Sequence, residues 1–167
     1  MKQQGLVICT ALALALVASS RTYAHCEIPC GIYNDQMRVV QMLEHITTIE
    51  KSMNQITASF EKDDMTPLDV QQLVRWISNK EDHADQLQHI VTQYFMTQRV
   101  KLPADGDAAA AKKYIAQLGP LHGILVHAMK AKQTVDLAHV EKLRALVQQF
   151  AEAYLSPEAV AHLKEHH

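Results

Sequence analysis

The feature that most constrains this chain is a series of apolar residues spaced alternately three and four apart. The series begins soon after Tyr33 and consists of Val39, Met42, Ile46, Ile49, Met53, Ile56 and Phe60. Such heptad spacing is typical of a helix that buries one narrow face against neighbouring helices, whereas a strand alternates every second residue. The pattern therefore predicts a long helix whose apolar side lies in a helical core.

A start signal and a further apolar series predict a second helix. Thr66 suits a helix N-cap, and Pro67 suits the first helical position because the N–H that proline lacks would be unbonded there anyway. The apolar series that follows consists of Val70, Leu73, Ile77, Ala84, Leu87, Val91 and Tyr94. Lys80 occupies the place of the missing apolar residue in this series.

The C-terminal half predicts one short helix and two longer ones. Residues 108–118 form the short helix, which Gly119 and Pro120 are expected to end. The next segment runs to about Lys132, and its inward-facing residues are Leu121, Ile124, Leu125 and Ala128. The last long helix is expected to be capped by Thr134, and its apolar series is Leu137, Val140, Leu143, Val147, Phe150 and Tyr154. A terminal turn is expected from Ser156.

Together these segments predict an all-α fold, an antiparallel up-and-down four-helix bundle. The length of 167 residues suits one such domain. Only 5 Gly and 5 Pro argue against a turn-rich β-sandwich or barrel. A net charge of −2 gives no reason to expect a nucleic-acid partner, and neither a Gly-rich phosphate loop nor a G-x-S-x-G motif is present.

Residues 1–24 are interpreted as a secretory signal peptide. Lys2 gives a basic start, residues 5–18 are an uncharged apolar run, and small residues precede the expected cut after Ala24. The run is too short to span a bilayer comfortably, so no stable membrane anchor is expected. Signal peptidase would leave a mature domain over 25–167, which is exported and therefore periplasmic or secreted.

The first nine residues of the mature chain carry the chemistry. They read His25-Cys26-Glu27-Ile28-Pro29-Cys30-Gly31-Ile32-Tyr33. Cleavage places two thiols and an imidazole beside a new free amine. Two thiolates, the amine and a backbone amide nitrogen can form a planar set of ligands, which suits Ni(II) or Cu(II) better than tetrahedral zinc. The imidazole of the first residue can then reach an axial position.

Two other interpretations of this segment remain open. In an exported protein, Cys26 and Cys30 can form a disulfide, although a loop over three intervening residues would constrain the unfolded chain very little. The same ligands can also serve a non-catalytic periplasmic nickel- or copper-binding helical bundle. Pro29 and Gly31 are expected to bend the loop so that both sulfurs face one point, which favours metal binding.

The motif His-Cys-x-x-Pro-Cys-Gly-x-Tyr over 25–33 resembles the nickel hook of nickel-containing superoxide dismutases. That family builds each subunit as a four-helix bundle and assembles six of them. The resemblance therefore implies a homohexamer with one nickel per subunit. It also implies an enzyme that disproportionates superoxide to oxygen and hydrogen peroxide by cycling between Ni(II) and Ni(III).

The resemblance assigns roles to individual residues of the hook. It implies that nickel is bound by the His25 amine, the Cys26 backbone nitrogen and the thiolates of Cys26 and Cys30. The His25 imidazole would bind axially in the oxidised state. Tyr33 would lie over the open face and restrict which anions approach. Tyr94 resembles a second tyrosine near the family's site, although a core aromatic is the other interpretation.

The sequence also departs from the family pattern. Where the family has Lys-Glu-x-Arg on the second helix, residues 80–83 read Lys-Glu-Asp-His, so His83 would take the place of the arginine that supports the axial imidazole. The family's glutamate on the first helix has no clear counterpart, and Val40 and Gln41 are nearest. The orientation of the axial His25 therefore depends on residues that the motif does not identify.

The remaining charged and imidazole side chains are interpreted more simply. Arg38 and Lys80 are the basic residues expected to steer superoxide, since the overall charge does not attract an anion. His45, His89 and His139 are expected to be solvated, since their neighbours are polar. A second metal is not expected at His122 and His127, because they lie five apart and share a helix face poorly.

Overall fold

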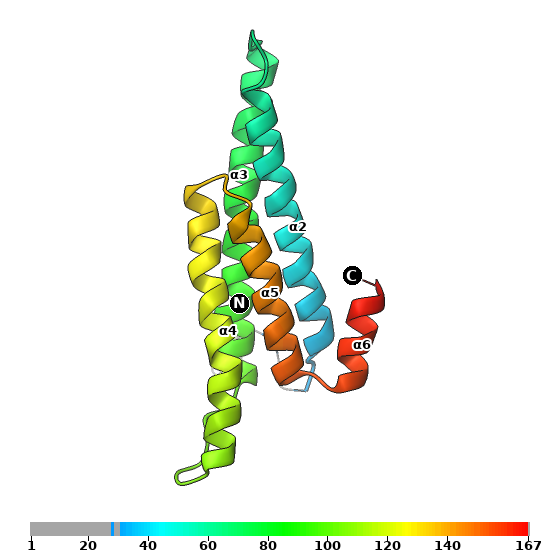
Figure 1. Ribbon diagram of the computed structural model, residues 1–167, viewed down its shortest axis with the longest axis vertical. Coiled ribbons are helices and arrows are strands. Elements are labelled where there is room, and N and C mark those ends of the chain that lie inside the picture. The colour runs from blue at the N-terminus through cyan, green and yellow to red at the C-terminus, as the bar shows by residue number, and fades with distance from the viewer. Residues whose placement is uncertain (1–27, 29–30, 167) are drawn as a thin grey trace, which may run out of the picture.

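The computed structural model describes Ile28 and residues 31–166, and every regular element in that part of the chain is helical. The elements are α2 (Asp35–Ser59), α3 (Pro67–His89), η1 (Ile90–Arg99), α4 (Ala108–Gln133), α5 (Ala138–Tyr154) and α6 (Pro157–His166) (Figure 1). The short segment η1 is a π-helix that continues α3 without a break. The expected all-α class is confirmed for the described residues. The predicted signal peptide lies outside them.

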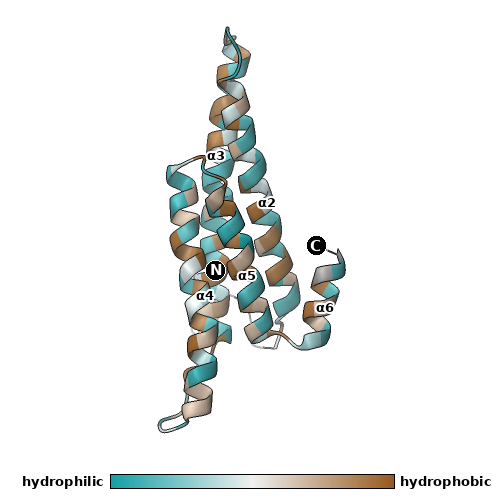
Figure 2. Ribbon diagram, viewed as in Figure 1, coloured by the Kyte–Doolittle hydropathy of each residue, from teal (hydrophilic) through white to brown (hydrophobic). Residues whose placement is uncertain are grey.

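The helices surround one core. Helix α2 packs against α3 and α5, and α4 packs against α5, α3 and η1. Apolar and polar residues alternate along the helices (Figure 2). The buried core residues contributed by α2 are Val39, Met42, Ile46, Ile49, Met53 and Ile56. These are the predicted series without its last member, and each fully buried side chain of this size stabilises the fold by about 1.5–3 kcal/mol.

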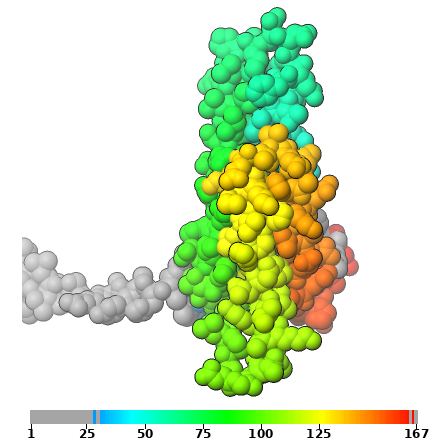
Figure 3. Space-filling model, turned by 60° about the vertical axis from the view of Figure 1, so that its left-hand side comes forward, coloured from blue at the N-terminus to red at the C-terminus, as the bar shows by residue number. Residues whose placement is uncertain are grey.

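The far ends of α2 and α3 leave this core. Residues 57–77, which we call the distal arm, extend beyond α4 and α5 as a pair of helices (Figures 1 and 3), and none of them is buried. Phe60 is 70% exposed, and Val70 and Ile77 are 48% and 41% exposed. The expectation that these three residues face a core is wrong, because each arm helix has only the other as its neighbour.

The observed course of helix α4 differs from two predictions. It runs unbroken through Pro120, so Gly119 and Pro120 do not end it. Pro120 has no N–H to donate to the carbonyl of Ala116, four residues earlier. Ala116 is exposed, so water can bind this carbonyl instead. Thr134 ends α4 and does not cap α5, whose first N–H, that of Ala138, donates to the carboxylate of Asp136 at 2.9 Å.

Lys80 is not a surface cation. Its side chain is buried, and its ammonium group donates to the carbonyls of Lys132 and Thr134 at 2.7 and 3.1 Å. Those carbonyls lie at the C-terminal end of α4, where the helix dipole favours a positive charge. The expectation that Lys80 steers superoxide is therefore wrong for this subunit.

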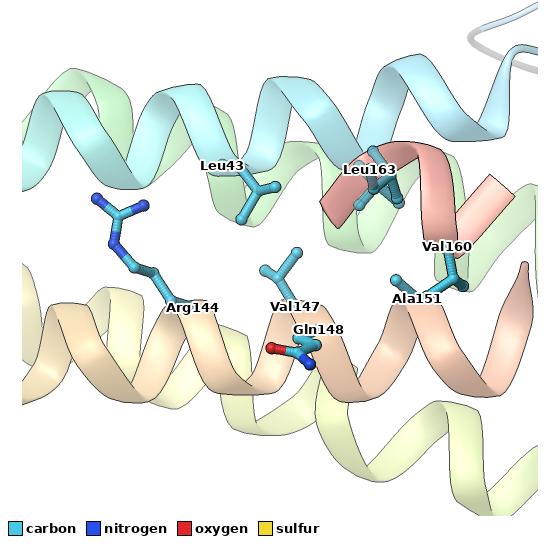
Figure 4. A pocket seen from close by; sticks show the side chains of 8 residues that line it. Leu43, Arg144, Val147, Gln148, Ala151, Val160 and Leu163 are labelled. Atoms are coloured by element: carbon cyan, nitrogen blue, oxygen red, sulfur yellow. The ribbon is translucent and has the colours of Figure 1, made fainter. Parts of the chain in front are cut away.

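Helix α6 begins at Pro157, as predicted, and packs across α2 and α5. Its Leu163 is buried, and a hollow of about 230 Å³ remains where the three helices meet (Figure 4). The hollow is mostly apolar, with Arg144 at one end paired to Glu50 of α2 at 2.6 Å. Among the described helices, none has both the length and the apolar character needed to cross a membrane.

Candidate metal centre and its anchor

The predicted ligands His25, Cys26 and Cys30 lie outside the described residues, whereas the end of the same motif lies within them. Gly31 has a φ of 91°, in the left-handed region that favours glycine, so the chain turns here as predicted. Ile28 and Tyr33 are half-buried against the core. The described end of the motif is thus attached to the body of the protein.

Two side chains of η1 hold the ring of Tyr33. The edge of the ring meets Tyr94, with 5.9 Å between centroids and 72° between planes. The guanidinium carbon of Arg99 lies 4.1 Å from the Tyr33 centroid, a cation–π distance. Tyr94 is buried and packs on Phe95, so it is both a core aromatic and a neighbour of Tyr33. The two interpretations of Tyr94 are therefore compatible.

The carboxylate of Asp35 lies beneath this contact and accepts four hydrogen bonds. Arg99 donates from Nε to Oδ1 at 2.8 Å and from Nη2 to Oδ2 at 2.6 Å. The hydroxyls of Tyr94 and Tyr154 donate to Oδ1 and Oδ2 at 2.7 and 2.8 Å. We call these four residues the Asp35 cluster. It joins the start of α2 to η1 and α5, immediately beyond Tyr33.

The π-helical geometry of η1 makes the Asp35 cluster possible. In η1 hydrogen bonds join residues five apart, as in the bond from the Val100 N–H to the Phe95 carbonyl at 2.8 Å. Residues five apart in an α-helix point about 140° away from each other around the axis. One π-helical turn instead brings Tyr94 and Arg99 to the same side, where both reach Asp35.

The charge state of the cluster is fixed at neutral pH. Burial alone would raise the pKa of Asp35, but the hydrogen bonds from Arg99, Tyr94 and Tyr154 outweigh it and lower that pKa. Burial, together with the neighbouring carboxylate, raises the pKa of Tyr94 to about 12 and also raises the pKa of Tyr154. The carboxylate is therefore ionised and both phenols remain donors.

A polar groove of about 430 Å³ lies between α2 and α3 beside this cluster. Its lining residues include Arg38, Gln41, Glu44, His45 and His83. Arg38 donates to the side chain of Gln41 at 2.9 Å and lies 5.0 Å from the ring centroid of Tyr94. Gln41, one of the two candidates for the missing glutamate, therefore lines a groove next to the Asp35 cluster.

Two pairs of histidines face each other across helices. Nδ1 of His45 lies 2.8 Å from Nδ1 of His83, and Nδ1 of His127 lies 3.2 Å from Nδ1 of His139. The expectation that His45 and His139 are simply solvated is wrong. Burial and the facing imidazole lower the pKa of His45, with Glu44 opposing the shift, and burial and the facing imidazole lower that of His127. His83 is thus paired within its own subunit, and its predicted contact with His25 falls outside the described residues.

Comparison with known families decides the assignment. A family model described as nickel-containing superoxide dismutase matches residues 20–157. This chain belongs to the nickel-containing superoxide dismutase family. The match confirms the family that the motif over 25–33 resembles. Searches of curated proteins and of solved structures gave no significant match.

Membership in the nickel superoxide dismutase family identifies an oxidoreductase with a nickel cofactor. Among the described residues there is no group of three or more His, Cys, Asp or Glu side chains that could hold a metal ion. The side chains of the motif over 25–33 fit nickel, because two thiols and an imidazole offer soft sulfur together with a nitrogen ligand.

The sequence did not reveal that the Asp35 cluster holds the described end of the motif. Asp35 reads as an acidic residue that suits the first turn of a helix, and its position alone gives no sign of four donors. Arg99 and Tyr154 are 64 and 119 residues from Asp35 in the chain. The one trace of the Asp35 cluster in the sequence is the spacing of five between Tyr94 and Arg99. A heptad pattern of apolar residues does not include that spacing.

Proposed function

We propose that this chain disproportionates superoxide at a nickel centre formed by His25, Cys26 and Cys30 at the start of an exported, antiparallel four-helix bundle. The observation that carries the proposal is the motif over 25–33, directly after a signal-peptide pattern and inside the family match over 20–157. When bound there, nickel would supply the one-electron Ni(II)/Ni(III) couple that takes an electron from one superoxide and gives one to the next.

The ligand residues would act through their protonation states. Removal of residues 1–24 turns the His25 nitrogen from an amide into an amine that can donate a lone pair. Cys26 and Cys30 would bind as thiolates, so their affinity for the metal falls as they are protonated in acid. The imidazole of His25 would be a further nitrogen ligand, and polar groups such as those of the groove between α2 and α3 would support it.

The Asp35 cluster supports a role for Tyr33 at this centre. Arg99 and Tyr94 fix the Tyr33 ring, and Asp35 fixes both of them. A ring held in one position restricts the approach of anions more than a mobile ring does. Arg38 would supply the positive charge that steers superoxide, as predicted, whereas the charge of Arg99 is paired with the Asp35 carboxylate.

We further propose that the active form is a homohexamer with one nickel per subunit, in the periplasm or outside the cell. A site on a nine-residue terminal segment has few contacts of its own, so a neighbouring subunit would cover it. The exposed apolar residues of the distal arm provide surface that such an assembly can bury.

Substitution of the thiols tests the proposal directly. Cys26→Ser and Cys30→Ser should each abolish nickel retention and superoxide loss, while the helical circular dichroism spectrum stays unchanged. Ile32→Ala is the matched control, since this exposed residue lies in the same segment and has no ligand atom. Stoichiometric nickel and full turnover in either serine variant would show that the assignment is wrong.

The same donors also suit Cu(II), which keeps a non-catalytic metal-binding bundle as the second candidate. Metal analysis and an activity assay on one sample separate the two. Stoichiometric nickel with superoxide loss no faster than that with free nickel would favour the binding protein. A Cys26–Cys30 disulfide in the freshly purified mature chain, found by thiol titration, would contradict both.

A further inference from the structure

The pair His45 and His83 has the geometry of a metal site that is separate from the N-terminal motif. We propose that these two imidazoles bind a divalent transition-metal ion of the class that prefers nitrogen ligands, such as Zn²⁺, Ni²⁺ or Cu²⁺. Both residues lie within α2 and α3, and neither belongs to the motif over 25–33. The proposal needs no ligand from that motif, so it can be tested with Cys26 and Cys30 replaced.

The distance between the two nitrogens carries the inference. The Nδ1 atoms are 2.8 Å apart, the ring centroids are 5.0 Å apart, and the ring planes differ by 59°. A tetrahedral metal ion held at 2.0–2.1 Å separates two imidazole nitrogens by roughly 3.3 Å, with both lone pairs directed at the ion. The two Nδ1 atoms face each other across a hydrogen bond, so the rings would have to move apart by roughly half an ångström and turn toward a common point to hold the ion.

The hydrogen bond between the rings fixes their protonation. A contact of 2.8 Å between two Nδ1 atoms requires one of them to carry a proton and the other to present a lone pair. For a metal ion to bind both Nδ1 atoms, the proton between them moves to Nε2 of the donor ring, so that both rings remain neutral imidazoles. The pair thus brings two neutral imidazoles together before the ion arrives.

The groove around the pair can complete the coordination. It is open to solvent, so water can fill the remaining positions, and Gln41, Thr48 and Glu44 offer oxygen atoms. Glu44 favours positive charge at His45. The groove also contains Arg38 and His89, but the Arg38 guanidinium is directed to Gln41 and to the ring of Tyr94.

The second histidine pair is the natural comparison. His127 and His139 are similarly spaced, with 3.2 Å between Nδ1 atoms. Lys130 and Lys142, however, disfavour positive charge at His127. Two pairs of nearly equal geometry therefore differ in local charge, and we expect metal binding at the pair beside Glu44.

Titration of the mature chain with Zn²⁺ alone tests this inference. Cys26→Ser and Cys30→Ser are introduced first, so that the thiols do not compete for the ion. In this background His45→Ala or His83→Ala should weaken Zn²⁺ binding at least tenfold by calorimetry. His127→Ala, the matched control, should leave it unchanged.

Imidazole nitrogen NMR provides a readout that does not depend on a variant folding. In the background protein, Zn²⁺ should shift the Nδ1 signals of His45 and His83 and leave those of His127 and His139 in place. Unchanged Nδ1 signals of His45 and His83 at saturating Zn²⁺ would overturn the inference. Equal affinity in folded His45→Ala, His83→Ala and parent proteins would overturn it as well.

Discussion

The two ends of the α2–α3 pair each have an aspartate in the first turn of a helix, but the two aspartates have very different neighbours. At the end near the N-terminal motif, Asp35 lies in the first turn of α2 and accepts hydrogen bonds from side chains of η1 and α5. At the distal arm, Asp69 lies in the first turn of α3 and accepts bonds only from nearby Thr66 and Lys62. One end is held by three elements and the other by a single pair of helices.

The difference shows that an end of a helix becomes rigid through its neighbours more than through its own sequence. Both helices have good start signals, since Asn34 caps α2 and Thr66 caps α3. Around Asp35, packed aromatic rings connect the Asp35 cluster to the core. The ring centroids of Phe95 and Phe150 are 4.7 Å apart, and those of Phe150 and Tyr154 are 5.1 Å apart. The distal arm offers exposed apolar surface instead, which suits contact with other subunits.

The largest contrast should appear when a phenylalanine is removed from each end. Phe95→Ala empties a fully buried position and should lower the free energy of unfolding by about 3–5 kcal/mol. Phe60→Ala removes a ring that is 70% exposed and should change it by less than about 0.5 kcal/mol. Urea denaturation of the two variants under monomeric conditions measures both effects, and similar losses would contradict the comparison.

A smaller contrast is expected between the two aspartates. Asp35→Asn removes the charge that Arg99, Tyr94 and Tyr154 share, and should lower the free energy of unfolding by about 1–3 kcal/mol. It should also lower superoxide turnover, because Tyr33 would no longer be fixed. Asp69→Asn, the control in the distal arm, should have a smaller effect on stability and none on turnover. Equal turnover in both variants would show that the Asp35 cluster does not contribute to catalysis.

The effect of Asp35 should depend on pH in a defined direction. Its pKa is lower in the folded protein than in the unfolded chain, so its contribution is complete well above the ordinary aspartate pKa of about 3.9. The contribution is lost as the pH falls through the lowered native pKa. The stability difference between wild type and Asp35→Asn should therefore shrink below about pH 4. Urea midpoints between pH 7 and 3 check this, and a constant or growing difference would refute it.

The smallest effect on stability should come from the apolar surface of the distal arm. Ile77→Ser changes a residue that is 41% exposed, and the free energy of unfolding of the isolated subunit should change by less than about 0.5 kcal/mol. If the arm is covered in the hexamer, the same substitution should reduce the mass seen by light scattering. An unchanged assembly would remove the arm from the interface.

The sequence predicted most of the helices because their signals are local. The apolar series from Val39 to Ile56 is buried as expected. Helix α3 starts where Thr66 and Pro67 predicted, with Thr66 and Asp69 forming a capping box. Seven-residue spacing and capping depend on neighbours along the chain, so no tertiary information was required.

Other features depended on residues that are distant in the sequence. Lys80 lies in a polar stretch, yet it is buried against carbonyls 52 and 54 residues away. His45 and His83 are 38 residues apart, and neither shows its partner in the sequence. The Asp35 cluster needs the π-helical register of η1, which no apolar spacing indicates. The sequence predicted a nickel site over residues 25–33, but it did not predict the side chains that hold Tyr33 in place.

The central claim is that catalysis depends on the free amine of His25, and one comparison tests it most directly. Two samples are prepared with nickel, one whose first residue is His25 and one with a single additional residue before it, both verified by mass. We expect equal helical spectra, but only the first sample should retain nickel and remove superoxide, because an added peptide bond turns the amine into an amide. Wild-type turnover in the extended sample would contradict amine ligation and the proposed centre with it.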